Sequence, residues 1–325
     1  MQKKLLGVDL GGTSTKFAII NQEGKIETQW SIPTDISDEG MHIVPNIISS
    51  IQKHLSELGL QSSDFLGIGM GSPGTVNRSE GTVIGAYNLN WKTLQAVKQP
   101  IEEALGIPLL IENDANVAAL GEQWCGAGNK EPNIVFITLG TGVGGGIILN
   151  NELILGAEGG AGEIGHITID GDGYKCTCGK IGCLETIASA TGIVRIARDR
   201  ANSFSDQPAL VESILSLDSD SDLTAKDIFD AAKKGDAFAE QVVQQYTHYL
   251  GYALANVGSL LNPSTIILGG GVSHAGSYLA DKVSYYVRQF IFPTLRDTIK
   301  IKIAELGNDA GVIGAASLVL AKMDN

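Results

Sequence analysis

Hydrophobic positions in the first third of the chain alternate with polar ones, as they do along β-strands. Several short apolar runs show this period or are apolar throughout, and Gly, Pro or Asn follows most of them. The predicted strands cover residues 4–10, 15–20, 26–32, 65–70 and 109–112. Residues 76–91 predict a short hairpin excursion from this sheet.

Between these strands, apolar residues recur every three or four positions, as on one face of an α-helix. Gly59 and Gly106 follow the first two such stretches, and glycine commonly ends helices. A third stretch opens at Asn113, where Asn or Asp is a common helix cap. The helices predicted here cover residues 38–58, 94–105 and 113–124.

The opening pattern repeats after residues 126–132, which are rich in Gly, Asn, Lys and Pro and which we interpret as a linker near a domain boundary. Strand, Gly/Thr turn and strand follow each other again, which is a weak internal repeat. Two similar domains facing each other would direct both turns toward one cleft. The later predictions are strands 134–139, 143–149, 153–155, 265–268 and 300–305, helices 187–199, 224–234, 237–261, 277–291 and 312–322, and a solvated excursion at 203–222 with a possible short helix at 210–215.

Composition and charge exclude several classes of protein. A length of 325 residues is enough for two domains with separate cores. The net charge of −13 argues against a nucleic-acid surface, which needs clustered Lys and Arg. Asp9 interrupts the first apolar run too early for a signal peptide, and no run of about eighteen apolar residues predicts a membrane span. We therefore expect a cytoplasmic protein without nucleic-acid or membrane partners.

The stretch from Glu163 to Glu185 concentrates metal-binding residue types. Its candidate ligands are His166, Cys176, Cys178 and Cys183. Three thiolates and one imidazole complete the tetrahedral set of a structural zinc, with no position left for water. The alternative is a disulfide and one odd thiol, but Cys-x-Cys rarely closes on itself and nothing else indicates an oxidising compartment. We predict zinc, with the two glutamates as ligand-binding carboxylates on its frame.

The Gly turn at residues 9–16 (DLGGTSTK) and Asp114 each have a plain structural explanation. A strand follows the turn, so it lacks the context of a dinucleotide fingerprint, and it also lacks the GK[ST] of a P-loop. Its N–H groups could bind phosphate, but taken alone the turn predicts a β-hairpin tip. Asp114 taken alone is a helix cap.

The order of the motifs is more specific than any one of them. The motifs are DLGGTSTK, GSPG, ENDAN, LGTGVGGG, EIGH, CTCGKIGCLE and ILGGGV. In this order they resemble the ROK family of sugar kinases and repressors over essentially the whole chain, and within it the bacterial ATP-dependent glucokinases. The cysteine motif is the most specific element.

The resemblance implies an α/β protein with the two-domain, actin-like (ribonuclease H-like) ATPase fold and an active-site cleft between the domains. The last helix would return to the first domain. We therefore expect a small domain of residues 1–115 plus 310–325. Residues 116–309 would form a large domain that carries the zinc motif.

The resemblance also implies an activity, the transfer of the γ-phosphate of ATP to the 6-hydroxyl of glucose. Asp114 would be the general base, and Asp9 would hold Mg²⁺. The expected sugar-binding residues are Gly74, Asn88, Asn113, Asp114, Glu163, His166 and Glu185. The expected nucleotide-binding residues are Asp9, Gly11, Gly12, Thr13, Lys16, Thr141, Gly142, Gly270 and Gly271. Such residues suit the chemistry, because phosphoryl transfer needs mainly positioning and charge neutralisation.

Several alternatives stay open at this point. The substrate could be N-acetylmannosamine, fructose or allose, and the phosphate donor could be polyphosphate. A non-catalytic sugar-sensing regulator is a further possibility, although Asp9 and Asp114 together favour an enzyme. Repressors of the family carry an N-terminal helix-turn-helix, whereas here the first strand is predicted from Lys4. We expect a homodimer or homotetramer, which the sequence does not decide.

Overall fold

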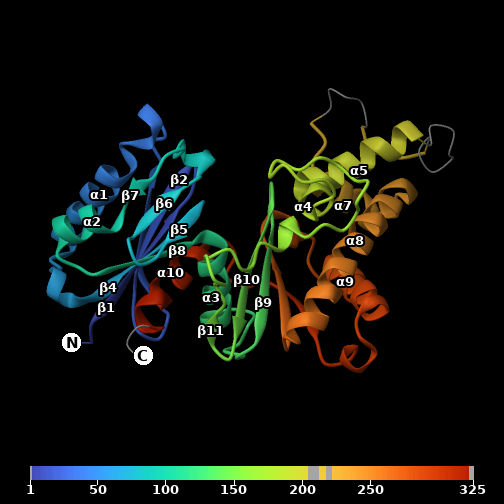
Figure 1. Ribbon diagram of the computed structural model, residues 1–325. Helices are drawn as coiled ribbons and strands as arrows, with labels where there is room; N and C mark the ends of the chain where they lie inside the picture. The colour runs from blue at the N-terminus through green and yellow to red at the C-terminus, as the bar shows by residue number, and fades with distance from the viewer. Residues whose placement is uncertain (1, 204–211, 217–221, 322–325) are drawn as a thin grey trace. The chain divides into compact units, whose positions relative to one another are not determined.

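Two five-stranded sheets organise the chain, which the contacts divide into two units. The computed structural model describes residues 2–203, 212–216 and 222–321 (Figure 1). The first unit comprises Met1–Pro132, Gly146–Gly162 and Glu305–Asn325, and the second comprises Asn133–Gly145 and Glu163–Ala304. Each unit combines strands and helices, as expected for an α/β protein.

The sheet of the first unit has the strand order β3-β2-β1-β4-β8. Its strands are β1 (Lys4–Leu10), β2 (Ser14–Ile20), β3 (Ile26–Pro33), β4 (Phe65–Ser72) and β8 (Leu109–Asn113). β2 is antiparallel to both of its neighbours, whereas β4 is parallel to β1 and to β8. Alternation alone predicted these strands to within two residues at each end.

Helices cover both faces of this sheet. They are α1 (Ile43–Leu58), α2 (Lys98–Leu105), α3 (Asp114–Cys125) and α10 (Ala310–Ala321). Leu6 and Val8 of β1 belong to the core that α1 and α2 complete, whereas Leu5 packs on the opposite side with Val312 of α10. This follows from the strand period of two, which sends neighbouring side chains to opposite faces.

α10 packs against α3 and the first sheet (Figure 1), so closely that side chains are excluded at some positions. A Cβ at Gly69 of β4 would be 1.7 Å from the carbonyl oxygen of Ala315. A Cβ at Gly314 would be 1.6 Å from the carbonyl oxygen of Val117 in α3. Glycine weakens a strand, and here the close approach of the helix requires it.

Because α3 packs within the first unit, the boundary between the units lies later in the chain than the expected one at residues 115 and 116. The expected large domain began at residue 116 and included most of α3. In the structure α3 lies along α10 and belongs to the first unit, which continues to Pro132. The segment 126–132, interpreted as a linker, thus ends at the boundary between the units.

The second sheet has the order β11-β10-β9-β12-β13, which repeats the connectivity of the first. Its strands are β9 (Ile134–Leu139), β10 (Val143–Leu149), β11 (Glu152–Leu153), β12 (Thr265–Gly269) and β13 (Lys300–Ile303). In both sheets the second strand pairs antiparallel with the third, and the fourth pairs parallel with the first. The weak internal repeat of the sequence is therefore a repeat of topology.

The helices of the second unit agree with the periodicity except near Ser189. They are α4 (Glu185–Ala188), α5 (Ala190–Ser203), α7 (Ala225–Lys233), α8 (Ala237–Leu261) and α9 (Ser277–Phe290). Residues 187–199 were predicted as one helix, which is wrong because Ser189 is extended, with φ −86° and ψ 171°. Its Oγ accepts a hydrogen bond from the N–H of Gly192 at 3.0 Å and so starts α5.

Two other helices begin later than predicted. The helix expected from residue 94 begins at Lys98, because β7 (Gln95–Ala96) pairs with β6 (Thr82–Ile84) in a small sheet that β5 (Thr75–Asn77) completes. The helix expected from residue 38 begins at Ile43, since Gly40 has a φ of 73°. Of the short helix expected at 210–215, residues 210 and 211 lie outside the described residues, and residues 212–215 are described but are not helical. In the described part of the chain, no helix combines the length and the apolar character needed to cross a bilayer.

Candidate active site

The β1–β2 hairpin places an acid beside an amine. Asp9 and Lys16 are register partners in the antiparallel pair, so their side chains leave the same face of the sheet. Gly11 donates its N–H to the carbonyl oxygen of Ser14 at 3.1 Å and closes the turn. Nζ of Lys16 donates to the carbonyl oxygen of Asn308 at 3.1 Å. The predicted strand–turn–strand is confirmed. Through Lys16, the part of the hairpin next to the turn is hydrogen-bonded to the segment before α10.

The carboxylate of Asp9 lies at the start of α10. A Cβ at Gly311 would be 2.5 Å from Cγ of Asp9. Burial raises the pKa of Asp9 to about 6, Lys16 lowers it, and the negative charge of Asp114 raises it further. Because the charge of Asp114 affects the pKa of Asp9, we treat the two acids as parts of one site within the first unit.

Asp114 is the first residue of α3, and the helix cap is its neighbour. The side chain of Asn113 accepts a hydrogen bond from the N–H of Ala115 at 2.9 Å, as an N-cap does. Asp114 also accepts from Ala115, at 2.8 Å, but its side chain remains accessible to solvent. Desolvation by the surrounding protein raises the pKa of Asp114, while the hydrogen bonds of the helix start lower it. Helix capping is therefore the role of Asn113 and does not explain why an acid stands at position 114.

Four other residues of the first unit that were predicted to bind sugar or phosphate lie in two adjacent pairs. Nδ2 of Asn113 donates to the carbonyl oxygen of Gly74 at 3.3 Å. Gly12 lies against Asn88, since a Cβ at Gly12 would be 3.0 Å from the carbonyl oxygen of Asn88. Thr13 is exposed at the hairpin tip, where its carbonyl oxygen accepts the N–H of Thr34 at 3.0 Å.

In the second unit, Glu185 holds the turn between β9 and β10. Oε2 of Glu185 accepts the N–H of Val143 at 3.0 Å. A Cβ at Gly142 would be 2.4 Å from the same oxygen, so a larger residue there would displace the carboxylate of Glu185. The exposed Thr141 is part of this turn, and its carbonyl oxygen accepts the hydroxyl of Thr191 at 3.3 Å.

Gly270 and Gly271 follow β12, next to the same turn. Gly270 has a φ of 78°, and a Cβ there would be 2.6 Å from the backbone nitrogen of Leu139 at the end of β9. Gly271 is exposed, with open space around its Cα. The parallel pairing of β9 with β12 thus brings together the two Gly loops of the second unit, as the predicted nucleotide contacts require.

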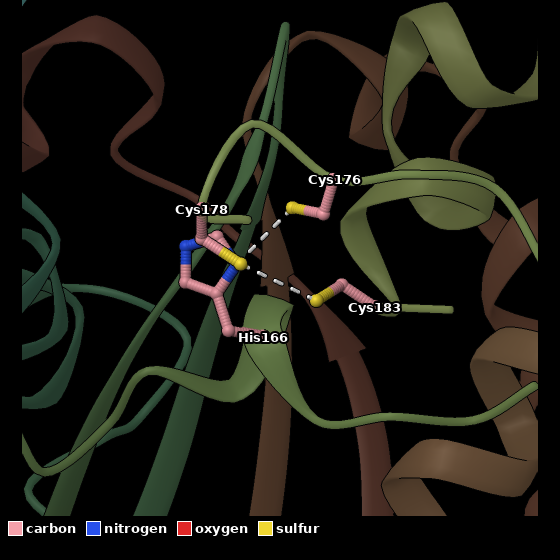
Figure 2. Close-up of side chains that lie close together, drawn as sticks. All are labelled: His166, Cys176, Cys178 and Cys183. Atoms are coloured by element: carbon pink, nitrogen blue, oxygen red, sulfur yellow. Dashed lines mark hydrogen bonds between the residues drawn. The ribbon is translucent and has the colours of Figure 1, made fainter. Parts of the chain in front are cut away.

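His166, Cys176, Cys178 and Cys183 converge as predicted (Figure 2). Their ligand atoms all lie within 4.8 Å of one another. Nδ1 of His166 is 3.6 Å from Sγ of Cys176, and the Sγ atoms of Cys178 and Cys183 are also 3.6 Å apart. A tetrahedral zinc with bonds of about 2.0–2.3 Å separates its ligands by about 3.3–3.8 Å. The donor set is that of a structural zinc, and these two separations fall within that range. All four cysteines of the chain are free thiols.

The two glutamates that flank this cluster differ in their surroundings. Oε1 of Glu185 accepts from Sγ of Cys176 at 3.9 Å, so the cluster touches the carboxylate that also holds Val143. Glu163 is exposed, and its Oε2 is 3.9 Å from Nε2 of His166. Of the two, Glu163 is the carboxylate with its oxygens more available to a ligand.

A pocket of about 530 Å³ in the second unit was missed by the sequence analysis. Thr141 and the first residues of α5 and α7 line it, together with Arg195 and Arg198. Asp199 adds one negative charge to the lining, but two helix N-termini and two arginines favour an anionic ligand. The two arginines, three residues apart in the second half of the helix predicted at 187–199, were a signal that could have indicated it.

Comparisons with known proteins agree with these motifs. Residues 5–322 match the ROK family. The chain is 46% identical to a glucokinase of Halalkalibacterium halodurans, over 97% of this chain and 94% of that protein. It is 38% identical to a glucokinase of Streptomyces coelicolor, over 96% of each.

A solved structure has the same architecture. The crystal structure of a ROK family glucokinase from Streptomyces griseus, in complex with glucose and AMPPNP, matches with a TM-score of 0.75 and 35% identity. The match covers 97% of this chain and 98% of that one. The expected actin-like α/β ATPase fold is thereby confirmed, and the chain belongs to the ROK family.

Proposed function

We propose that this protein is an ATP-dependent glucokinase, which transfers the γ-phosphate of ATP to the 6-hydroxyl of glucose and releases glucose 6-phosphate and ADP. The observation that carries the proposal is the position of Asp114, which is exposed and is the first residue of α3, directly after the Asn113 cap. The identity to glucokinases over nearly the whole chain supports the substrate.

Asp114 is the general base in this proposal. A base must reach the hydroxyl proton and be deprotonated near neutral pH, and a carboxyl with a raised pKa accepts protons better than an ordinary one. Asn113 caps the helix, so the carboxylate of Asp114 can turn to a substrate without loss of the cap. The sugar hydroxyl that Asp114 deprotonates becomes the nucleophile toward the γ-phosphate.

Carboxylates and amides supply most of the proposed sugar contacts. Each such group pairs with more than one hydroxyl. The proposed contacts are Gly74, Asn88 and Asn113 of the first unit and Glu163, His166 and Glu185 of the second. Gly74 and Asn113 are hydrogen-bonded to each other, so they act as one element.

Asp9 holds Mg²⁺ in this proposal, and the ion neutralises phosphate charge when bound. The carboxylate of Asp9 is the type of ligand that Mg²⁺ prefers. Backbone N–H groups of Gly11, Gly12 and Thr13, with the amine of Lys16, bind the phosphates. In the second unit the nucleotide contacts Thr141, Gly142, Gly270 and Gly271. The pocket beside Thr141, with Arg195 and Arg198, supplies the cationic surface that a nucleotide needs.

A structural zinc on His166, Cys176, Cys178 and Cys183 belongs to the same proposal. The ion would hold the ring of His166 and, through Cys176, the carboxylate of Glu185 in place. A homodimer or homotetramer that acts in the cytoplasm completes the proposal.

The test is a panel of hexoses with Mg-ATP in a coupled assay for ADP. Glucose should give the highest kcat/KM, ahead of fructose, allose and N-acetylmannosamine. Faster turnover of another hexose would support the kinase activity but reject glucose as the preferred substrate. Absence of ADP with every sugar and Mg-ATP, together with absence of sugar phosphate when polyphosphate is the donor, would reject the enzyme and favour a sugar-sensing regulator.

A further inference from the structure

Glu112 precedes the Asn113–Asp114 pair and is buried, with 3% of its surface exposed. Oε1 of Glu112 accepts the N–H of Asn113 at 2.8 Å and Nδ2 of Asn116 at 2.8 Å. Asp114 lies between these two residues in the chain. One carboxylate oxygen therefore holds the backbone before the proposed general base and the side chain of Asn116 after it.

The other oxygen, Oε2, accepts Nε of Arg78. The side chain of Arg78 is 41% exposed, whereas that of Glu112 is 4% exposed, so the pair joins a buried carboxylate to a guanidinium at the surface. A buried carboxylate needs a cation or strong donors, because its desolvation is otherwise unfavourable. Arg78 supplies the cation.

Arg78 sits in a turn that is rigid in its own right. It lies between β5 and β6, where Oδ1 of Asn77 accepts the hydroxyl of Ser79 at 2.8 Å and the N–H of Glu80 at 3.1 Å. Gly81 closes the turn by donating its N–H to the carbonyl oxygen of Asn77 at 2.8 Å. The guanidinium is thus presented by a preformed loop.

The side chain of Asn116 depends on Glu112. It is 3% exposed, and its Oδ1 has no hydrogen-bond partner among the described residues. Its Nδ2 bond to Glu112 is the one polar contact observed for this amide in the described part of the chain. Movement of Glu112 would therefore release the first turn of α3 at Asn113 and Asn116 together.

We propose that Arg78 is a positioning residue for phosphoryl transfer, which acts through Glu112 to hold the first turn of α3 and the carboxylate of Asp114. The inference rests on the proposed function, in which Asp114 is the base. The β5–β6 hairpin thereby becomes part of the active-site support. Without the guanidinium, Glu112 turns toward water and gives up its bonds to Asn113 and Asn116.

The experiment compares Arg78→Ala with Arg288→Ala in the full-length protein. Arg288 forms a surface pair with Asp297 at 2.7 Å and serves as the matched control. We expect kcat with glucose to fall about 10–100-fold in Arg78→Ala, as for a misplaced catalytic group, and to stay unchanged in Arg288→Ala. Methylguanidinium at millimolar concentration should restore part of the kcat in Arg78→Ala, because the site opens to solvent.

A second readout does not depend on turnover. Hydrogen exchange of a peptide over residues 109–120 should be about tenfold faster in Arg78→Ala, and methylguanidinium should slow it again. If wild type phosphorylates no hexose, the proposed function fails and this exchange decides whether Arg78 holds α3. Should Arg78→Ala not fold, Arg78→Lys replaces it, with smaller changes in the same directions.

Two results would overturn the inference. One is exchange over 109–120 that matches wild type in the Arg78 variant. The other is a loss of kcat that methylguanidinium does not restore and that comes with faster exchange throughout the chain, which would assign Arg78 to global stability alone.

Discussion

The carboxylate of Asp9 and the backbone of Gly311 are in direct contact, although they come from opposite ends of the chain. A Cβ at Gly311 would be 2.5 Å from both Cγ and Oδ2 of Asp9. Gly311 is the second residue of α10, so the helix start forms one wall of the proposed Mg²⁺ position. Lys16 is tied to Asn308 in the same segment, and both hairpin residues are thus set by the C-terminal part of the chain.

Gly311→Ala should displace Asp9. Alanine is the better helix former, so without this contact the substitution would be neutral or stabilising. We expect the apparent KM for Mg²⁺ to rise and kcat to fall by about 10²-fold, as for an ångström-scale misplacement. A Mg²⁺ titration of the coupled assay measures both. Gly160→Ala is the control, since its Cβ would meet open space. Unchanged Mg²⁺ dependence would contradict the role of Gly311.

Asp114→Asn should separate chemistry from capping. Asn113 remains the cap, so the free energy of unfolding should change little. An amide cannot accept the proton, and kcat should fall by about 10²–10⁴-fold while glucose binding survives. Turnover by coupled assay and binding by calorimetry test this. Asp236→Asn, at the N-cap of α8, is the control and should leave kcat unchanged. Near-normal turnover would move the search for the base to Glu163 or Glu185.

Asp9→Asn should stabilise the Mg²⁺-free protein at high pH. The folded-state pKa of Asp9 is about 6 and its ordinary value is 3.8, so the folded protein holds this proton more tightly. The charged form therefore destabilises the fold above about pH 6, and this effect disappears as the pH falls toward 4. We expect a gain of about 1–2 kcal/mol in unfolding free energy at pH 8 and almost none at pH 4. Urea titrations at both values measure it, and an equal gain at both would count against it.

Cys178→Ala should lose the metal and part of the sugar site. Metal analysis should find about one zinc per chain in wild type and almost none in the variant. The melting temperature should fall, and KM for glucose should rise about 10-fold or more, because His166 and Glu185 lose their support. Cys125→Ala removes the cysteine outside the cluster and should keep both metal and KM. A zinc-free preparation with wild-type KM would disprove the coupling.

Local signals in the sequence were sufficient wherever short-range sterics decide the structure. The hairpin at residues 9–16 was predicted because two alternating runs flank two glycines, and β1 and β2 follow that pattern. Helix ends at Gly59 and Gly106 were predicted from glycine alone, and both have a positive φ, of 66° and 65°. The four metal-ligand candidates were also predicted, because short loops keep three of them close along the chain.

Errors arose where a distant segment competed with local propensity, or where neighbouring residues offered two local solutions. Residues 94–97 have a helical pattern, but Gln95 and Ala96 pair with β6. Ser189 ends one helix and starts another through its own side chain. Asp114 was treated as a possible cap, whereas the cap is Asn113, and the two choices differ by a single residue in an otherwise identical pattern.

The sequence by itself determined the strands, most helices, the order of the motifs and the chemical types at the site, because periodicity and turn chemistry act over a few residues. Tertiary structure alone decided which of these residues meet. α10 returns to the first sheet, α3 stays with it, Gly311 meets Asp9, and Arg78 reaches Glu112. Such contacts depend on how helix and sheet surfaces fit together, and close packing selects among many arrangements that have the same local pattern.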